Sequence, residues 1–546
     1  MSDANRARVM NLGRLLTHTA RLYPQQPGLI LGDRQWTWQE IDRRVDAMVS
    51  ALRASGVREG DRILLQSRNH LQMFESCWVA FRLGCVWVPV NFRLTPPEVA
   101  YLGASSGAVL MIAERIFAGH VDAVRAATKT LTQVVWIGDT VEGENAGEYA
   151  GRNPGAASYE ELVQQHLGDS PQAAVVAPAD PLWFFYTSGT TGRPKAGVLT
   201  HGQMAFVVTN HLADLIPGTT AQDRSIAVAP LSHGAGIHAL LNVSRGAATV
   251  LLPGEKLDPA QVWQLVEQHR VSNLFTVPTI LKMLVEHEAV DRFDHGSLRY
   301  VIYAGAPMYR ADQKLALRKL GRVLVQYFGL GEVTGCITVL PPHMHSEHDA
   351  DPNANIGSCG HPRTGMEVAI LGDQLQPLKP GELGEICCRG PAVFAGYHAN
   401  PEATEKALRG GWFHTGDLGR MDDRGLLYIT GRESDMYISG GSNVYPREVE
   451  EVLLTHPGVA EVAVLGVPDA KWGEIGVAVV VRREGTAALD AAGLLAHLEG
   501  RCARYRWPRQ VFFWSALPKS AYGKITKNDV RRLLVERGEL PEAPIG

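Results

Sequence analysis

The stretch from Tyr186 to His201 reads Y-T-S-G-T-T-G-R-P-K-A-G-V-L-T-H and lies between two apolar runs, residues 182–185 and a segment that begins at Val198. Its glycines let the backbone turn several amides toward one point, and such nests of amides bind anions. Hydroxyl side chains add hydrogen-bond donors, and Lys195 adds a mobile positive charge. The stretch indicates a cradle for a nucleotide triphosphate; a polar hairpin loop is the simpler alternative, because Gly, Thr and Pro are common turn residues. The residues expected to bind the nucleotide here are Thr187, Ser188, Gly189, Thr190, Thr191 and Gly192.

Length and charge limit what the chain can be. Its 546 residues exceed the size of one hydrophobic core, so two or more domains are expected, and 45% hydrophobic content supports a large interior. Lys and Arg number 53 against 57 Asp and Glu, which gives a net charge of -4. Nucleic-acid binders carry a basic stripe, so we expect no nucleic-acid partner. Acidic substrates must then be bound by local donors.

The cysteines indicate a reducing compartment. There are seven, without C-x-x-C pairs, which favours free thiols and a cytoplasmic location. Cys387 and Cys388 are adjacent on a predicted strand, so their side chains should pack on opposite faces. Residues 1–16 hold no apolar core of a signal peptide. No window reaches the length of apolar sequence that spans a bilayer, so no transmembrane segment is expected.

Helical and strand patterns alternate along most of the chain. The segment from Thr37 to Glu40 fits a capping box, and apolar residues follow it at helical spacing as far as Leu52. A short apolar run at residues 63–65 predicts a buried strand. The same order returns with a helix opened by Asp258 and a strand over residues 274–277. This alternation predicts βαβ units and largely parallel sheets.

A domain boundary is expected near residues 431–441. Beyond it the pattern predicts a compact α+β unit of the usual domain size. Its elements are a helix over 446–454, strands over 460–465 and 476–481, and a helix around 489–498. We therefore predict an α/β protein with a large N-terminal domain of parallel and mixed sheets flanked by helices (1–433) and a small mobile C-terminal domain (434–546).

The string from Tyr186 is not a Walker loop, because G-x-x-x-x-G-K-[ST] is absent. It resembles T-S-G-T-T-G-x-P-K-G, the signature loop of the adenylate-forming (ANL) superfamily, with Ala196 in place of the last glycine. That superfamily holds acyl-CoA synthetases, beetle luciferases and nonribosomal peptide adenylation domains. Further motifs match in the family's order over nearly the whole chain. The chain is similar to the acyl-CoA synthetase branch.

The resemblance implies an adenine site and a metal ligand. Gly305, Ala306 and Pro307 look like the loop that lies along adenine, although such a triplet alone would be an ordinary turn. The run Y-F-G-L-G-E at residues 327–332 resembles the Y-G-x-T-E motif, which places Phe328 on the adenine ring and Glu332 on Mg²⁺. Gly331 stands where relatives have a threonine that contacts the α-phosphate.

The resemblance also implies ribose contacts. The segment His414–Asp417 and the pair at residues 431–432 are similar to the paired ribose-binding motifs. A carboxylate can accept two hydrogen bonds from vicinal hydroxyls, which suits Asp417. Arg432, with its fork of donors, can reach ribose or phosphate oxygens. A structural ion pair is the alternative for each.

Lys524 ends a run, P-K-S-A-Y-G-K, that resembles the family's C-terminal motif, and implies a catalytic lysine that neutralises charge as acid and α-phosphate react. In the family the small domain then rotates about a position that falls at Ser434 here, where Asp or Lys is usual; Asp435 is adjacent. Rotation would withdraw Lys524 and bring Gly440 and Gly441 toward the pantetheine of coenzyme A. Lys195 completes the implied catalytic set with Glu332.

The acyl pocket follows from the same resemblance. His233 lies in a P-L-S-H-G-A-G segment similar to P-L-F-H-x-x-G and is interpreted as a gating or lining residue, with simple packing as the alternative. The other pocket residues implied are Ile237, His238, Gly305, Gly329, Gly331 and Val339. Several of these residues are small, which leaves room for more than acetate and favours a medium- or long-chain, aromatic or alicyclic acid. None of them is an obvious basic partner for a second carboxylate, which disfavours dicarboxylates.

These inferences together predict an acyl-CoA synthetase. ATP and a carboxylic acid would give acyl-AMP and pyrophosphate, and coenzyme A would then displace AMP; Mg²⁺ is the implied cofactor. Transfer to a carrier protein or luciferase-like oxidation are alternatives on the same fold, and a non-catalytic nucleotide-binding scaffold is a third. A homodimer is left open. His343, His345 and His348 form a tempting transition-metal cluster, but their Pro- and Asp-rich surroundings predict an exposed loop, so Glu332 is the preferred metal ligand.

Overall fold

The computed structural model describes residues 7–138, 157–187, 193–254, 256–306, 308–469, 471–486, 489–519 and 525–540. Within them, a sheet of seven strands has the order β7-β6-β5-β3-β4-β8-β9. All neighbours are parallel except the last pair, in which β8 and β9 form an antiparallel hairpin. The strands are β3 (Arg62–Gln66), β4 (Val86–Val90), β5 (Leu110–Glu114), β6 (Gln133–Ile137), β7 (Ala157–Ser158), β8 (Pro181–Thr187) and β9 (Lys195–Thr200). The helices of this part are α3 (Trp38–Ala54), α4 (Leu71–Leu83), α5 (Pro96–Ser106), α6 (Ala118–Ala127) and α8 (Tyr159–Gln165).

A second sheet has nine strands in the described ranges, in the order β16-β15-β14-β13-β12-β10-β11-β1-β2. Its middle is parallel, and antiparallel strands close both edges. The strands are β1 (Pro27–Leu31), β2 (Arg34–Thr37), β10 (Arg224–Ala227), β11 (Ala248–Leu251), β12 (Asn273–Thr276), β13 (Tyr300–Tyr303), β14 (Leu324–Phe328), β15 (Thr338–Leu340) and β16 (His361–Pro362). The helices are α2 (Arg14–Leu22), α9 (His201–Asp214), α10 (Gly234–Ser244), α11 (Pro259–His269), α12 (Pro278–Glu286) and α13 (Arg310–Leu320).

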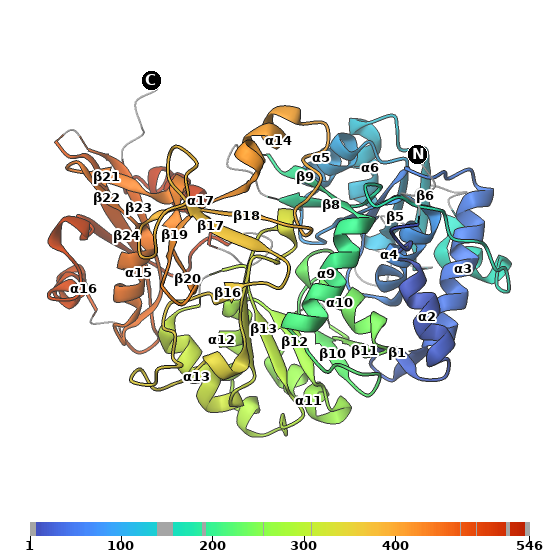
Figure 1. Cartoon of the computed structure of the whole chain (residues 1–546), viewed down its shortest axis with the longest axis horizontal. Coiled ribbons are helices and arrows are strands. Elements are labelled where there is room, and N and C mark those ends of the chain that lie inside the picture. Colours follow the sequence, from blue (N-terminus) through green and yellow to red (C-terminus); the bar gives the residue numbers. More distant parts are fainter. Residues whose placement is uncertain are drawn as a thin grey trace.

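Two smaller sheets complete the described fold. One is antiparallel, β17-β18-β19-β20, and the other joins β21 to β25 at one end of the molecule (Figure 1). The first contains β17 (Glu367–Leu371), β18 (Gly384–Arg389), β19 (Phe413–Met421), β20 (Leu427–Arg432) and α14 (Pro401–Ala407). The second contains β21 (Tyr437–Ser439), β22 (Ser442–Val444), β23 (Val459–Asp469), β24 (Gly473–Arg482), β25 (Gln510–Trp514), α15 (Pro446–Leu454), α16 (Ala491–Leu498) and α17 (Lys527–Glu536). The predicted α/β class, with parallel and mixed sheets and a smaller C-terminal α+β unit, is confirmed.

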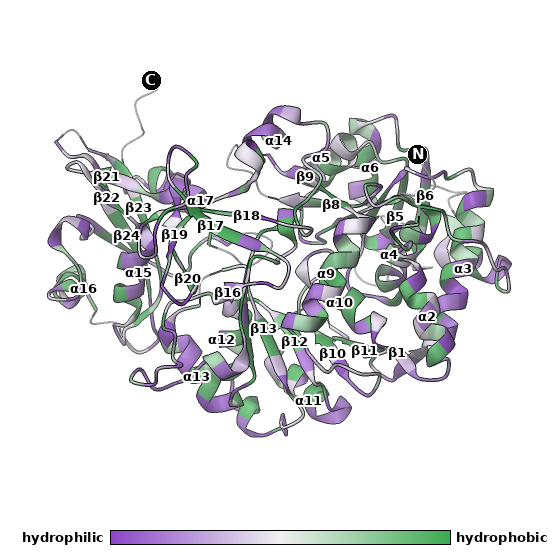
Figure 2. Cartoon of the chain, viewed as in Figure 1, coloured by the Kyte–Doolittle hydropathy of each residue, from purple (hydrophilic) through white to green (hydrophobic). Residues whose placement is uncertain are grey.

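Local sequence explains where the helices begin. In the capping box of α3, Thr37 N donates to Glu40 Oε2 (2.7 Å) and Glu40 N donates to Thr37 Oγ1 (3.2 Å), so two orphan amides are paired. Asp258 caps α11 by accepting a hydrogen bond from Ala260 N at 2.9 Å. The predicted helix over residues 446–454 is α15. Figure 2 shows hydrophilic residues along outer helices such as α13, while the sheet strands are hydrophobic.

One core joins the two large sheets. It contains Trp183 and Phe185 of β8, Leu240 of α10 and Tyr327 of β14, all buried. The ends of β8 and β9 also contact the short 3-10 turn η3 (Gly331–Val333) that follows β14. The fold therefore brings the hairpin of one sheet against the carboxyl end of the other.

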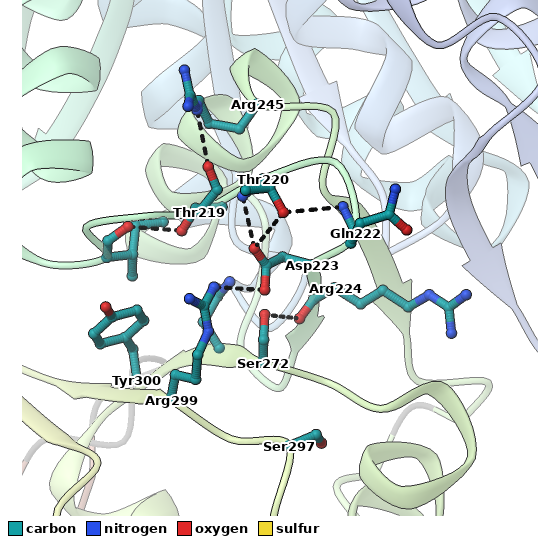
Figure 3. A network of polar contacts seen from close by, with 12 residues as sticks. Thr219, Thr220, Gln222, Asp223, Arg224, Arg245, Ser272, Ser297, Arg299 and Tyr300 are labelled. Carbon is teal, nitrogen blue, oxygen red and sulfur yellow. Dashed lines mark hydrogen bonds and ion pairs between the residues drawn. The ribbon is translucent and has the colours of Figure 1, made fainter.

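The amino ends of the parallel strands are tied by a polar network (Figure 3). Asp223, just before β10, accepts hydrogen bonds from Thr220 N (2.7 Å) and from the guanidinium of Arg299 (2.6 Å), which precedes β13. Tyr300 OH donates to Pro217 O at 2.7 Å, and Ser272 Oγ donates to Arg224 O at 3.2 Å. These contacts stabilise the end of the sheet at which the parallel strands begin. The candidate site lies at the other end, where the strands finish.

All seven cysteines are free thiols. Cys387 packs with Trp412, and Cys388 packs in the core shared by the large sheets, so the prediction that they face opposite sides of β18 is confirmed. Burial raises the pKa of the Cys387 thiol to about 12 and that of Cys336 to about 11. Cys502, in the small C-terminal unit, is the one cysteine that is not buried. None of the described helices is long and apolar enough to cross a membrane.

Candidate active site

The string that is predicted to bind the nucleotide begins at the end of β8 and continues into β9, which pair as an antiparallel hairpin. Thr187 at the end of β8 lies opposite Lys195 at the start of β9. Both residues therefore stand at the mouth of the loop between them. The expected ligands within that loop, Ser188, Gly189, Thr190, Thr191 and Gly192, lie outside the described residues.

Glu332 lies on η3, beneath the mouth of this hairpin. Its carboxylate is buried, with 4% of the residue exposed. Thr187 Oγ1 and Tyr397 OH both donate to Glu332 Oε1, each at 2.9 Å. Glu332 Oε2 is buried and has no hydrogen-bond partner in the described structure. One oxygen is thus held in place, and the other is left for a ligand.

Tyr397 reaches this carboxylate from a segment that runs beside β9. Tyr397 forms a bridge with Gly197, and Phe394 N donates to Glu332 O at 2.8 Å. Lys195 Nζ lies 5.5 Å from the centroid of the Tyr397 ring. Burial, and then the charge of Glu332, raise the pKa of the Tyr397 phenol, so it remains a donor at neutral pH. Sequence reasoning missed Tyr397, because a single tyrosine 65 residues from its partner carries no pattern.

The glycines around Glu332 are places of close approach. A Cβ on Gly331 would lie 2.6 Å from the Phe185 ring and 2.8 Å from Thr187 Cγ2. A Cβ on Gly329 would lie 2.4 Å from Gly335 Cα. Real Cβ atoms do not come so near, so a threonine at position 331 would have to displace the side chains of Phe185 and Thr187 on β8. Gly331 is thereby explained by packing, and its predicted place in the acyl pocket stays a prediction.

The predicted adenine residues are neighbours in the sheet. Phe328 ends β14, and Gly305 and Ala306 follow the adjacent parallel strand β13. Gly305 has a φ of +83°, which a residue with a side chain rarely adopts. Phe328 is partly buried against the core of the two sheets. Pro307 lies outside the described residues.

The predicted ribose residues face each other across β19 and β20. Asp417 pairs with Arg432 in the strand register, and Arg432 Nε lies 3.2 Å from Asp417 Oδ1. Asp417 is buried, whereas half of the Arg432 side chain is exposed. The guanidinium can therefore move to a ligand while the carboxylate stays fixed.

Glu385 on β18 contacts the part of β19 that leads to Asp417. Its Oε1 accepts a hydrogen bond from Gly416 N at 3.1 Å, and its Oε2 lies 2.7 Å from His414 Nδ1. Glu385, Cys387 and His414 are the one group of possible metal ligands among the described residues. The guanidinium of Arg409 lies 2.9 Å from Glu385 Oε2, which places a positive charge where a cation would bind. We interpret the group as a hydrogen-bond network. No sequence pattern pointed to Glu385.

Three of the predicted acyl residues, His233, Ile237 and His238, lie on α10 or directly before it. The His233 ring lies next to the Phe185 ring, with centroids 4.3 Å apart, and Ile237 and Val339 are buried. His238 is stacked on Phe275, with centroids 4.5 Å apart and planes 13° apart. Burial, and then the charge of a nearby arginine, lower the pKa of His238 to about 3, so it is neutral.

Sequence comparison agrees with this arrangement. Residues 16–398 match the AMP-binding enzyme family, and residues 448–524 match the AMP-binding enzyme C-terminal domain. The chain belongs to the AMP-binding enzyme family. It is 37% identical over 529 residues to a feruloyl-CoA synthase of Amycolatopsis sp, covering 96% of this chain and 99% of that protein. It is 34% identical over 530 residues to an indoleacetate–CoA ligase of Aromatoleum aromaticum, covering 97% and 99%.

A solved structure extends the likeness of this AMP-binding enzyme. The o-succinylbenzoate CoA synthetase from Bacillus subtilis, in complex with its acyl-adenylate intermediate, superposes with a TM-score of 0.79 at 29% identity. The match covers 95% of this chain and 98% of that chain. The resemblance to the adenylate-forming superfamily is confirmed.

Two further predictions for the AMP-binding enzyme concern its C-terminal part. Lys524 lies outside the described residues. Gly440 and Gly441 form the turn between β21 and β22, with φ of +57° and +81°. Gly440 N donates to Trp472 O at 2.9 Å, within the same small unit. The approach of this turn to pantetheine stays a prediction.

His343, His345 and His348, for which the sequence predicted an exposed loop, do not form a group of possible metal ligands among the described residues. His343 and His348 are exposed, as expected of a loop, but the expectation is wrong for His345, which is fully buried. His345 Nε2 lies 3.1 Å from Tyr303 OH, and Nδ1 lies 3.0 Å from Pro341 O. Both ring nitrogens are therefore engaged, and the three side chains face different surroundings.

Proposed function

We propose that this protein is an AMP-forming acyl-CoA synthetase that activates a ring-bearing carboxylic acid with ATP and transfers the acyl group to coenzyme A. The observation that carries the proposal is the cluster of Thr187, Lys195, Glu332 and Tyr397 at the mouth of the β8–β9 hairpin. It joins a cation, hydroxyl groups and a buried carboxylate beside a glycine-rich loop. Such a set suits the triphosphate of ATP.

Glu332 fits a divalent cation. Its unpaired Oε2 is a hard oxygen ligand, and Oε1 is held by two hydroxyl groups so that the carboxylate cannot turn. Mg²⁺ bound there would neutralise part of the phosphate charge. Thr187 and Tyr397 then serve to orient the ligand oxygen.

The remaining residues divide the reaction between them. Lys195 would attract the phosphates, Phe328 and the residues 304–306 would hold the adenine, and Asp417 would accept from the ribose hydroxyls. The acid enters already ionised at neutral pH, so its attack on the α-phosphate needs no general base. Lys524 would stabilise the charge that acid and phosphate share as pyrophosphate leaves.

The second half-reaction needs the small unit to move. The thiolate of coenzyme A attacks the acyl carbon, and the bond to AMP breaks with AMP as leaving group. In this proposal Lys524 withdraws and the turn at Gly440 and Gly441 approaches the site, pivoting near Ser434. The 3-10 turn between β20 and β21, which contains Ser434, is exposed there.

The substrate class follows from the relatives together with the pocket. The two named relatives act, by name, on ferulate and indoleacetate, and both acids carry an aromatic ring. His238, Phe275 and Tyr327 stack on one another with ring planes 13–25° apart, so aromatic rings surround this predicted acyl residue. Cytoplasmic location and homodimer formation stay predictions.

The test is release of AMP from ATP with a panel of ring-bearing and aliphatic acids, each with and without coenzyme A. The proposal expects AMP and acyl-CoA in equal amounts, with release dependent on both acid and coenzyme A. Acyl-AMP that accumulates unchanged by coenzyme A would support transfer to a carrier protein or oxidation. ATP binding without AMP release from any acid would support the scaffold alternative.

A further inference from the structure

A cavity of about 490 Å³ lies at the amino ends of strands β3, β4 and β8, at the opposite end of β8 from the mouth of the hairpin. This volume falls within the roughly 300–1,000 Å³ that is typical of sites for small ligands. Val175, which lines the cavity, is 66% exposed, so solvent reaches it. The proposed acyl-CoA synthetase reaction makes no use of this space.

The apolar part of the cavity suits a ring. Val86, Val176 and Phe184 line it, and each is at most 5% exposed. The imidazole of His398, also in the lining, lies against the Phe184 ring, with centroids 4.5 Å apart and planes tilted by 32°. Aromatic rings attract further rings in offset or edge-on arrangements. Phe184 and His398 therefore provide a surface on which a ring of a ligand can pack.

The carboxylates of the cavity favour a cation. Glu59 and Asp180 both line it, and Glu59 is exposed. Asp180 Oδ2 accepts a hydrogen bond from Ala177 N at 2.7 Å. Within the ranges that the structure describes, neither carboxylate forms an ion pair. Two negative charges are thus available to a positively charged group.

The one cation in the lining, Arg62, is already bound by the main chain. Its three guanidinium nitrogens donate to the carbonyls of Ser106, Gly60 and Gly107 at distances of 2.8–3.0 Å. Burial, and then the charge of Arg62, lower the pKa of His398, so its imidazole is neutral and keeps one nitrogen that can accept a hydrogen bond. The cavity therefore offers acceptors to an ammonium group and disfavours an anion.

One short segment connects the cavity to the candidate active site. Residues 395–398 run antiparallel to β9, where His398 N donates to Ala196 O at 2.9 Å. Successive side chains of an extended segment point to opposite faces. His398 accordingly lines the cavity, while Tyr397 OH donates to Glu332 Oε1 at 2.9 Å. A group bound against His398 thus acts on the segment that orients the candidate metal ligand.

We propose that this cavity is a second ligand site, which takes a primary amine carried on an aromatic or alicyclic ring and strengthens the binding of ATP when it is occupied. The ring packs on Phe184 and His398, and the ammonium group pairs with Glu59 or Asp180. An occupied cavity restrains His398 and, with it, the position from which Tyr397 holds Glu332. The site itself does not depend on the synthetase reaction, whereas its effect rests on the proposed binding of ATP and Mg²⁺ beside Glu332.

A ligand-observed NMR titration of the full-length protein tests the site, with phenethylamine as ligand and 2-phenylethanol as its neutral counterpart. The amine should bind at least about fivefold more tightly than the alcohol, because it alone can pair with the carboxylates. Glu59→Gln should weaken amine binding about two- to fivefold, the effect of one exposed ion pair. Val175→Trp, which fills the cavity from an exposed position, should weaken it at least about tenfold. Glu161→Gln, an exposed carboxylate on α8, is the matched control and should keep the wild-type affinity.

Calorimetric titration with ATP in the presence of Mg²⁺ tests the effect on the nucleotide site. Saturating phenethylamine should lower the Kd for ATP at least about twofold in the wild-type protein, because binding at one site that favours the other lowers the free energy of both. In Tyr397→Phe, which keeps the cavity and loses the hydrogen bond to Glu332, the amine should leave the Kd for ATP unchanged.

Each result decides one part of the proposal. Failure of the wild-type protein to bind the amine, or unchanged binding by Val175→Trp, overturns the site. Equal binding of amine and alcohol overturns the choice of an amine. An unchanged or raised Kd for ATP in the wild-type protein overturns the link to Glu332, and absence of ATP binding overturns that link together with the proposed function. None of these measurements requires AMP release, so an inactive acid panel would not alter them.

Discussion

Replacing Tyr397 with phenylalanine tests the role given to Glu332. The change removes one of the two hydrogen bonds on Oε1, each 2.9 Å long, and keeps the ring beside Lys195. A hydrogen bond to a charged group contributes about 1.5–3 kcal/mol, and Thr187 retains its own bond. We therefore expect a loss of about 1.5 kcal/mol, which corresponds to about tenfold in kcat/KM for ATP. The apparent affinity for Mg²⁺ should fall in parallel, because the ligand oxygen Oε2 is less well oriented.

The assay is AMP release over a titration of Mg²⁺ at saturating acid. Glu332→Gln should show a larger effect than Tyr397→Phe, since it replaces the ligand itself. Tyr428→Phe is a matched control: Tyr428 OH also donates to a carboxylate, Asp422 Oδ2 at 3.2 Å, but on β20 away from the hairpin. An unchanged Mg²⁺ dependence in both Tyr397→Phe and Glu332→Gln would refute the reasoning.

Other predictions concern the two half-reactions, packing and pH. Lys524→Ala should abolish acid-dependent pyrophosphate exchange and spare thioester formation from supplied acyl-AMP; equal loss of both would contradict domain alternation. Gly441→Val should slow the thioester step preferentially in single-turnover experiments, and unchanged kinetics there would count against its role. Gly331→Thr should destabilise the protein by about 1–3 kcal/mol in urea unfolding, because a Cβ there clashes with β8. Burial lowers the pKa of His201 and of His345 to about 4, so the unfolded chain binds their protons first as pH falls below about 6.5. Each of the two histidines should therefore lower the free energy of unfolding by about 2 kcal/mol at about pH 5 relative to pH 7. Equal urea midpoints at the two pH values would contradict this.

Local features were readable from the sequence because they depend on neighbours along the chain. The capping box at Thr37 and the helix over 446–454 are set by residues within one or two turns. The approach of Gly305 to Phe328 also follows from the sequence once β13 and β14 are taken as adjacent parallel strands.

Contacts between distant segments were not readable. Tyr397 meets Glu332 only because residues 394–398 lie beside β9, and Glu385 meets His414 through a strand pairing 29 residues apart. The buried state of His345 was missed for a related reason, since its partner Tyr303 lies 42 residues away. Both ring nitrogens of His238 are buried without a hydrogen-bond partner in the described structure. No pattern within α10 predicts this, because the possible partners would come from other segments.

The cysteines offer a way to follow the motion of the small unit that the proposed mechanism includes. Six thiols are shielded by the interior, and Cys502 alone is within reach of a reagent from solvent. A fluorescent maleimide should thus attach at one position of the small unit without any cysteine being removed first. Changes in its emission on addition of ATP and acid, and then of coenzyme A, would report whether that unit swings between the steps.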